Sequence, residues 1–234
     1  MSAFNSDRRR TILAAGGLSL VAIAAVRAAG QQKEAEVTAN EDLMREHGVI
    51  RRALIVYAEA ARRARRDVKA IPFPSLLETA QLFRRFAEDY HERALEEAHI
   101  FPLVRKLKSP VAELPDVLVA QHRRGREITD YILKVAARGS LSAAEAESFP
   151  ATLESFVAMY EPHTAREDTV IFPAWKAALG EKRYDEMGDR FEDIERKMFG
   201  HDGFEDAVKR ITQIETAFKL SDLSSVTAPP PPAT

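Results

Sequence analysis

Three histidines and three glutamates in this 234-residue chain have the types and the spacing of a buried metal site. They are His47, Glu92, Glu96, His122, His163 and Glu167. The pairs Glu92/Glu96 and His163/Glu167 are each four residues apart, so each pair shares one face of a helix. Burying unpaired carboxylates costs several kcal/mol each, and a bound cation removes that cost. Imidazole and carboxylate ligands without sulfur suit iron, manganese or zinc.

An internal repeat relates the two acidic segments. Residues 96–102 read Glu-Glu-Ala-His-Ile-Phe-Pro and residues 167–173 read Glu-Asp-Thr-Val-Ile-Phe-Pro, an offset of 71 (167 − 96). The dipeptides Glu46-His47 and Gln121-His122 repeat in the same way on two other segments. The pattern predicts a doubled helical hairpin with a pseudo-two-fold axis, and histidine or glutamate side chains from all four helices would meet in its core.

One ligand position is open to two interpretations. The offset of 71 places Glu92 opposite His163, whereas His91 is four residues from Leu95 and not from a glutamate. Either Glu92 takes the ligand position, as the register favours, or the helix is locally overwound and His91 serves instead.

Apolar residues at steps of three and four predict the helices that position these side chains. The predicted helices span residues 40–69, 75–108, 116–137, 142–179, 181–198 and 202–219. Prolines near residues 72 and 110 and a C-cap glycine at Gly139 separate the first four, and Ser142 with Glu145 forms a capping-box sequence at the start of the fourth. We expect an all-α fold, an up-down-up-down four-helix bundle with two short C-terminal helices.

The expected domain organisation follows from these elements. It comprises a signal or anchor at 1–30, a bundle at 38–180, a helical extension at 181–220 and a proline-rich tail at 221–234. Four consecutive prolines place the tail outside the fold.

These motifs resemble the haemerythrin-like family, also called the HHE cation-binding domain. That family has His on its first and third helices and His-x-x-x-Glu on its second and fourth. The resemblance spans about 40–179; the Ile-Phe-Pro after Glu167 fits closely, and His47 and His122 fit in kind and position. The second helix departs from the pattern at Glu92. An extra oxygen ligand there would stabilise ferric iron and disfavour reversible oxygen carriage.

The resemblance implies two non-haem iron ions, with manganese or zinc less favoured. Glu96 and Glu167 would bridge the ions; His47 and Glu92 would complete one, and His122 and His163 the other. The expected partner is O2, NO or peroxide, and iron handling is a related role. A binding or sensing module is one hypothesis, a di-iron oxidoreductase with an electron donor is a second, and a structural bundle with an inert metal is a third.

Two other histidines have weaker claims to be ligands. His99 forms a Glu-x-x-His unit with Glu96, but the repeat has Val170 at the matching position, so we expect His99 to be peripheral. His201 lies between Gly200 and Gly203, and we expect a solvated loop residue.

Composition narrows the classes of partner. A formal net charge of −2 gives no reason to expect a nucleic-acid partner. The absence of cysteine excludes disulfides, iron–sulfur clusters and thiolate zinc sites.

The N-terminus carries an export pattern. Arginines at 8–10 precede Thr-Ile-Leu and an apolar stretch at 14–26, as in a twin-arginine signal, and small residues at 28–30 offer a cleavage site. We expect export to the periplasm; the alternative is an uncleaved membrane anchor, for which the apolar stretch is short.

Overall fold

The computed structural model describes residues 37–232, and all of its regular structure is helical. The expected signal or anchor at 1–30 lies outside the described residues. Between residues 37 and 232 no strand is present, and no helix combines the length and the apolar character needed to cross a bilayer. The expected all-α class is confirmed.

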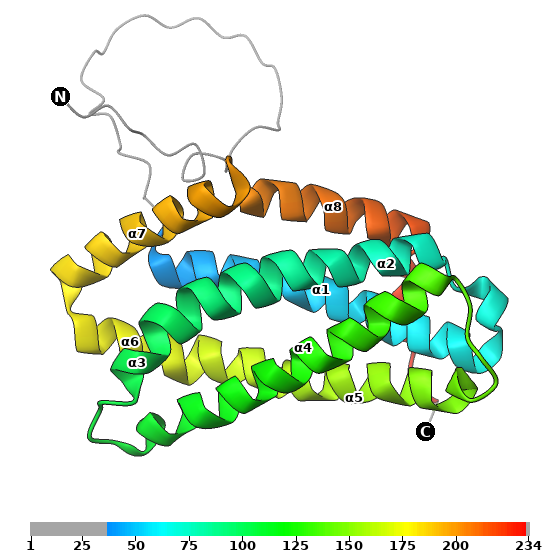
Figure 1. The fold of residues 1–234 in the computed structure, drawn as a ribbon, viewed down its shortest axis with the longest axis horizontal. Helices are drawn as coiled ribbons and strands as arrows, with labels where there is room; N and C mark the ends of the chain where they lie inside the picture. The colour runs from blue at the N-terminus through cyan, green and yellow to red at the C-terminus, as the bar shows by residue number, and fades with distance from the viewer. Residues whose placement is uncertain (1–36, 233–234) are drawn as a thin grey trace, which may run out of the picture.

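Long helices lie along one another in an elongated bundle (Figure 1). The first long helix, α1 (Ala39–Arg66), packs along α5 (Glu145–Arg166). The helix α2 (Phe73–Leu82) packs along α4 (Leu114–Arg138). Side chains from different helices therefore meet along the axis of the bundle.

Two segments of the bundle are wound as π-helix. The segment η3 (Phe83–Ile100) continues α2 and leads into α3 (Phe101–Val104). The shorter η5 (Glu167–Ile171) links α5 to α6 (Phe172–Leu179). Their last bonds match across the repeat, because the N–H of Phe101 donates to the carbonyl of Glu96 and the N–H of Phe172 donates to that of Glu167.

This winding corrects one sequence interpretation. Local overwinding near His91 is wrong, because bonds between residues five apart put more residues, not fewer, into each turn. In a π-helix, side chains five residues apart point the same way. A sequence pattern based on steps of three and four cannot predict that side chains five residues apart share a face.

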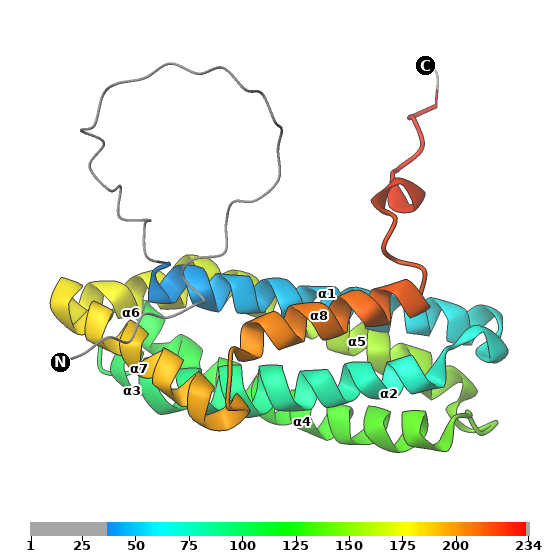
Figure 2. The same cartoon turned by 90° about the horizontal axis from the view of Figure 1, so that it is seen from above.

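A second layer covers one side of the bundle. The helices α7 (Glu181–Phe199) and α8 (Gly203–Ala217) lie over α1 and α2 (Figures 1 and 2). Arg52 of α1 holds α8 through Nε to Glu215 Oε1 at 2.9 Å. Trp175, fully buried at the end of the bundle, stacks on Phe191 of α7 with ring centroids 5.6 Å apart.

Helix ends follow local capping chemistry. Thr38 and Glu41 form a capping box that starts α1, which the sequence pattern did not predict. The first helix ends at Arg66 and not at 69, because Asp67 leaves the helix and caps the short 3-10 turn η2 (Val68–Ala70). At the start of α5 the expected box is half formed: the carboxylate of Glu145 accepts the N–H of Ser142 at 2.8 Å.

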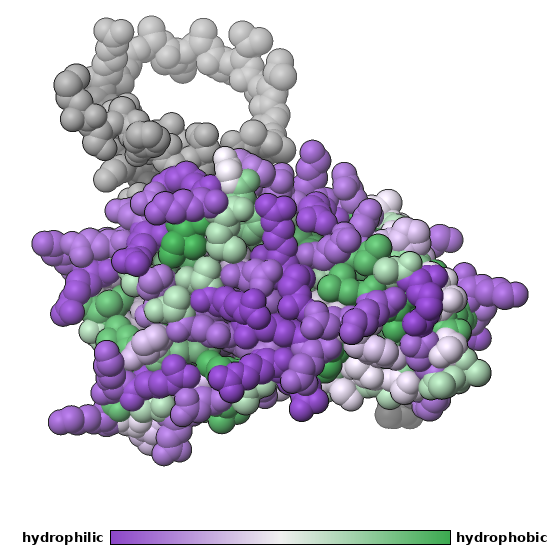
Figure 3. All heavy atoms as spheres, in the orientation of Figure 1, coloured by the Kyte–Doolittle hydropathy of each residue, from purple (hydrophilic) through white to green (hydrophobic). Residues whose placement is uncertain are grey.

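Shorter turns complete the described chain. The 3-10 turn η4 (Pro110–Glu113) leads into α4, and η6 (Leu223–Val226) follows α8. After α8 the chain leaves the bundle (Figure 2), and residues 221–232 are exposed. Polar and charged residues cover most of the face shown in Figure 3, so the apolar faces of the helices are largely turned inward.

Gly125 provides a test of how closely α4 and α5 pack. A Cβ added there would meet the Tyr160 Oη at 2.2 Å and its Cζ at 3.0 Å. We predict that Gly125→Ala lowers the free energy of unfolding in urea by about 1–3 kcal/mol, as overpacked cores do. Gly48→Ala on α1 is the control, because a Cβ there meets nothing within 4 Å. Equal effects of the two substitutions would contradict this packing.

Candidate metal centre

Two groups of buried side chains lie in the core of the bundle. In each group the three candidate ligand atoms lie within 4.8 Å of one another. The groups are His47, His91 and Glu96, and His122, His163 and Glu167. Every member is at most 3% exposed, so each is shielded from bulk water.

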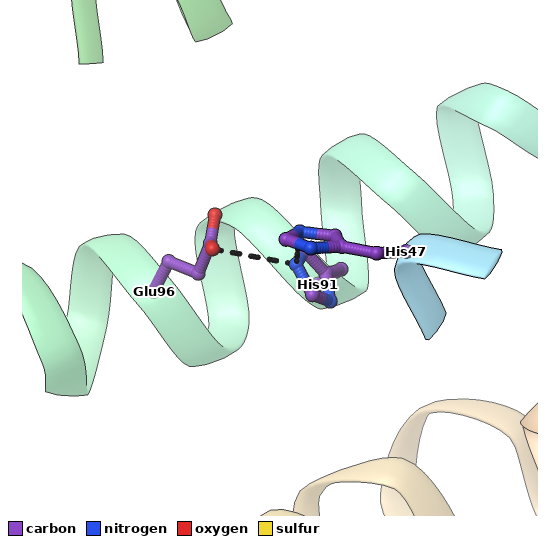
Figure 4. A group of neighbouring side chains, drawn as sticks. All are labelled: His47, His91 and Glu96. Atoms are coloured by element: carbon purple, nitrogen blue, oxygen red, sulfur yellow. Dashed lines mark hydrogen bonds and ion pairs between the residues drawn. The ribbon is translucent and has the colours of Figure 1, made fainter. Parts of the chain in front are cut away.

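The first group joins α1 to η3 (Figure 4). The Nε2 atoms of His47 and His91 lie 2.9 Å apart, and His91 Nε2 lies 3.3 Å from Glu96 Oε1. A second carboxylate reaches the same place, because Glu167 Oε2 lies 3.5 Å from His47 Nε2. Two imidazole nitrogens and two carboxylate oxygens therefore converge here.

The second group has the same composition. The Nε2 atoms of His122 and His163 lie 3.1 Å apart, and His163 Nε2 lies 3.1 Å from Glu167 Oε1. Glu96 Oε2 lies 3.5 Å from His122 Nε2. Each glutamate thus offers one oxygen to each group, which is the arrangement of a carboxylate that bridges two metal ions.

The two carboxylates shared by both groups have no hydrogen bonds to the described part of the chain. All four oxygens of Glu96 and Glu167 are buried and have no hydrogen-bond partner among the described residues. Ligands held about 2.0–2.2 Å from one ion lie roughly 3 Å from each other, close to the spacing seen here. The residues present therefore fit a pair of cations held by nitrogen and oxygen.

Each histidine of the two groups has an oxygen acceptor on its second nitrogen. The pairs are His47 Nδ1 with Asp168 at 2.6 Å, His91 Nδ1 with Glu46 at 2.6 Å, His122 Nδ1 with Glu97 at 2.9 Å and His163 Nδ1 with Gln121 at 2.8 Å. A proton on Nδ1 leaves the lone pair on Nε2, facing the other imidazole and the carboxylates. With this tautomer the two Nε2 lone pairs face each other and repel unless a proton or a metal cation lies between them.

Two arginines support the acidic acceptors. Arg51 pairs with Asp168 and Arg126 pairs with Glu97. Burial raises the pKa of Glu97, but hydrogen bonds from His122 and Arg126 outweigh it and lower that pKa to about 2. The carboxylate therefore stays ionised at neutral pH and can hold the imidazole in place.

Two phenylalanines form apolar walls. Phe172 stacks on His47 with centroids 5.4 Å apart, and Phe101 stacks on His122 at 5.6 Å. Both come from the repeated Ile-Phe-Pro sequence. The walls restrict how the rings rotate and keep water from their outer faces.

The structure places Glu92 away from the first group. Its carboxyl accepts from Tyr160 Oη at 2.8 Å and from Arg126 Nη2 at 3.1 Å, and its nearest ligand histidine is His122, at 3.9 Å from Nδ1. Burial raises the pKa of Glu92 well above its usual value. Arg126 already supplies a cation beside Glu92 and Glu97. The π-helical register brings His91, the sequence alternative, to the position expected of Glu92.

The two histidines with weaker claims lie where the sequence predicted. His99 is half-buried against Phe191, and exposed His201 bonds to Asp206 at 2.6 Å. Neither is a member of the two groups.

Sequence reasoning missed the residues that accept from the Nδ1 atoms. Each of them directly adjoins a candidate ligand: Glu46, Glu97, Gln121 and Asp168. That adjacency, repeated in both halves, was the available signal.

Comparison with known families agrees with this geometry. The family described as Hemerythrin HHE cation binding domain matches residues 38–175. The chain belongs to this family. Uncharacterized proteins of Mycobacterium bovis and Mycobacterium tuberculosis are each 40% identical to it over 197 residues, which cover 84% of this chain and 76% of the relative. No solved structure matches.

The likeness to the relatives extends beyond the HHE domain, whose match ends at residue 175. Each relative aligns over 197 residues. Such an alignment is longer than the whole stretch from the first residue of the chain to the end of the domain. It therefore includes residues that follow the domain.

A buried carboxyl near the two His/Glu groups makes stability depend on pH. Glu88 is fully buried, accepts from Thr129 Oγ1 at 2.6 Å and pairs with Arg84. Burial disfavours its charge and raises its pKa from 4.5 to about 7. The folded state therefore holds this proton between about pH 4.5 and 7, where the unfolded chain releases it, so stability falls as pH rises through that window.

We predict that Glu88→Gln removes this dependence of stability on pH. The free energy of unfolding of the parent chain, relative to this variant, should fall by roughly 2–4 kcal/mol between pH 5 and pH 8. Urea titrations at the two pH values measure it. A difference between the chains that does not change with pH would contradict a raised pKa at Glu88.

Proposed function

We propose that this HHE domain is a non-haem di-iron protein whose metal pair binds or senses O2, NO or peroxide. One observation carries the proposal. Four buried carboxylate oxygens, from Glu96 and Glu167, lie between two pairs of imidazole nitrogens and have no hydrogen-bond partner among the described residues. Leaving such carboxylates ionised in a dry core costs several kcal/mol each, and two cations offset that cost.

The proposed ligand set follows the two groups. His47 and His91 hold one iron, His122 and His163 hold the other, and Glu96 and Glu167 bridge them. His91 replaces Glu92 in this set, because the nearest ligand histidine to Glu92 is His122 and not a member of the first group. We infer that the long helices form the up-down-up-down four-helix bundle in which such bridged pairs are held.

Iron is the metal that this donor set favours. Nitrogen and oxygen donors without sulfur, arranged around bridging carboxylates from two helices, are typical of di-iron bundles. Bound iron would supply a change of oxidation state and open positions for a small ligand. The protein's own part is to orient the imidazoles through Nδ1 and to exclude water with Phe101 and Phe172.

A small cavity lies near the first group, although none of the six candidate ligands lines it. A cavity of about 10 Å³ lies between α1, η3 and α7, and Glu46 and Leu95 line it. This is roughly the space that one water molecule needs.

Metal analysis tests the ligand set. The full chain purified in air should carry about two irons, with near-ultraviolet oxo-bridge absorption. Glu167→Ala should lose both, because it removes a bridge. His91→Ala should lower the iron content, whereas Glu92→Gln and His99→Ala should retain it. Loss of iron in Glu92→Gln with retention in His91→Ala would restore the sequence-based ligand set, and absence of metal from the parent chain would refute the proposal.

Peroxide addition distinguishes a binding or sensing protein from a di-iron oxidoreductase. A binding or sensing protein should give a spectral change that saturates at stoichiometric peroxide and then stops. This is the result that the binding or sensing proposal predicts. Sustained consumption of excess peroxide by the iron-loaded chain, absent from Glu167→Ala, would support a di-iron oxidoreductase instead.

A further inference from the structure

The two halves of the site match in all but one of their acceptor contacts. Arg51 and Arg126 are related by an offset of 75 (126 − 51), and the same offset relates His47 to His122 (122 − 47). Asp168 and Glu97, which the arginines support, are related by the offset of 71 that also relates the bridging glutamates (168 − 97). The units His47–Asp168–Arg51 and His122–Glu97–Arg126 are therefore equivalents, each with one carboxylate and one guanidinium.

The match breaks at the other histidine of each half. His91 Nδ1 has the carboxylate of Glu46 at 2.6 Å, whereas His163 Nδ1 has the amide oxygen of Gln121 at 2.8 Å. Glu46 and Gln121 are again related by the offset of 75 (121 − 46), so they are equivalents of different charge. Glu46 is 1% exposed and also accepts from Tyr90 Oη at 3.0 Å.

A carboxylate and an amide act differently on a ligand imidazole. A negative acceptor on Nδ1 makes Nε2 a stronger donor and lowers the free energy of a cation bound there, while a neutral amide mainly orients the ring. The half with His47 and His91 thus has two anionic acceptors, Asp168 and Glu46. The half with His122 and His163 has one, Glu97.

We propose that the contact between Glu46 and His91 makes the two metal positions unequal, so that a divalent cation binds first and more tightly between His47 and His91. The inference rests on the proposed function, because it requires both positions to hold metal. Glu46 is the specificity-determining residue of the pair, although it is not itself a ligand. The other half, with Gln121, is the weaker position.

The position of Glu92 would favour the opposite order of binding. Its carboxyl lies nearer to the weaker half, 3.9 Å from His122 Nδ1. It shares Arg126 with Glu97, so a cation of the protein already accompanies it. The order therefore depends on the acceptors of His91 and His163, and Glu92→Gln serves as a control in which the order stays the same.

Stepwise binding of Co(II) to the metal-free full chain tests the inference. The spectra of His122→Ala and His47→Ala serve as references, because each leaves one half intact. The first equivalent added to the parent chain should give the spectrum of His122→Ala, and the second should bind at least about tenfold more weakly. Circular dichroism checks that each variant keeps its helices.

Two matched substitutions then exchange the acceptors. Glu46→Gln should weaken the first equivalent by roughly 10–100-fold, and Gln121→Glu should tighten the second. The double variant Glu46→Gln/Gln121→Glu should reverse the order, so that its first equivalent resembles His47→Ala. Reversal in a nearly isosteric exchange would not follow from a packing role for Glu46.

Three results overturn the inference. Equal affinities for two equivalents in the parent chain would remove the inequality while leaving a two-metal site intact. An order that the double exchange does not change would remove the role of Glu46. Failure of the parent chain to bind any Co(II) would instead refute the proposed function, and this inference with it.

Discussion

Burial of two carboxylates without hydrogen bonds is the constraint on which the rest of this structure depends. Glu96 and Glu167 face each other's histidines in a core where an uncompensated ion costs several kcal/mol. Hydrogen bonds within the described residues do not offset that cost. Positive charge beside these carboxylates would offset the cost, which agrees with the description of the family as cation-binding.

The winding of the second helical segment adapts the chain to that constraint. His91 and Glu96 are five residues apart and would diverge on an α-helix, but π-helical bonds through η3 align them. The fourth segment keeps the α-helical spacing between His163 and Glu167 and becomes π-helical just after it. A difference of one residue in the sequence is thus absorbed by the backbone, and the two halves of the site present the same donors.

Contacts to the Nδ1 atoms and to the ring faces orient the imidazoles of the two groups. Asp168, Glu46 and Glu97 each supply a carboxyl acceptor to an imidazole, and stacking by Phe101 and Phe172 limits rotation of two of the rings. Helices α7 and α8 lie against the same bundle, and α7 contributes part of the small cavity that reaches Glu46. The extension after the family domain therefore shapes the surroundings of the site as well as covering the core.

The sequence by itself determined the helical class, the approximate extents of the helices and the pattern of His and Glu candidates, because apolar periodicity and the internal repeat are visible without coordinates. It could not decide between His91 and Glu92. That choice depends on backbone hydrogen bonds five residues apart, and side-chain periodicity assumes bonds four apart. Nor could it pair Glu46 with His91 or Gln121 with His163, since those contacts cross between helices. Only the tertiary structure places a carboxylate on one histidine and an amide on its equivalent.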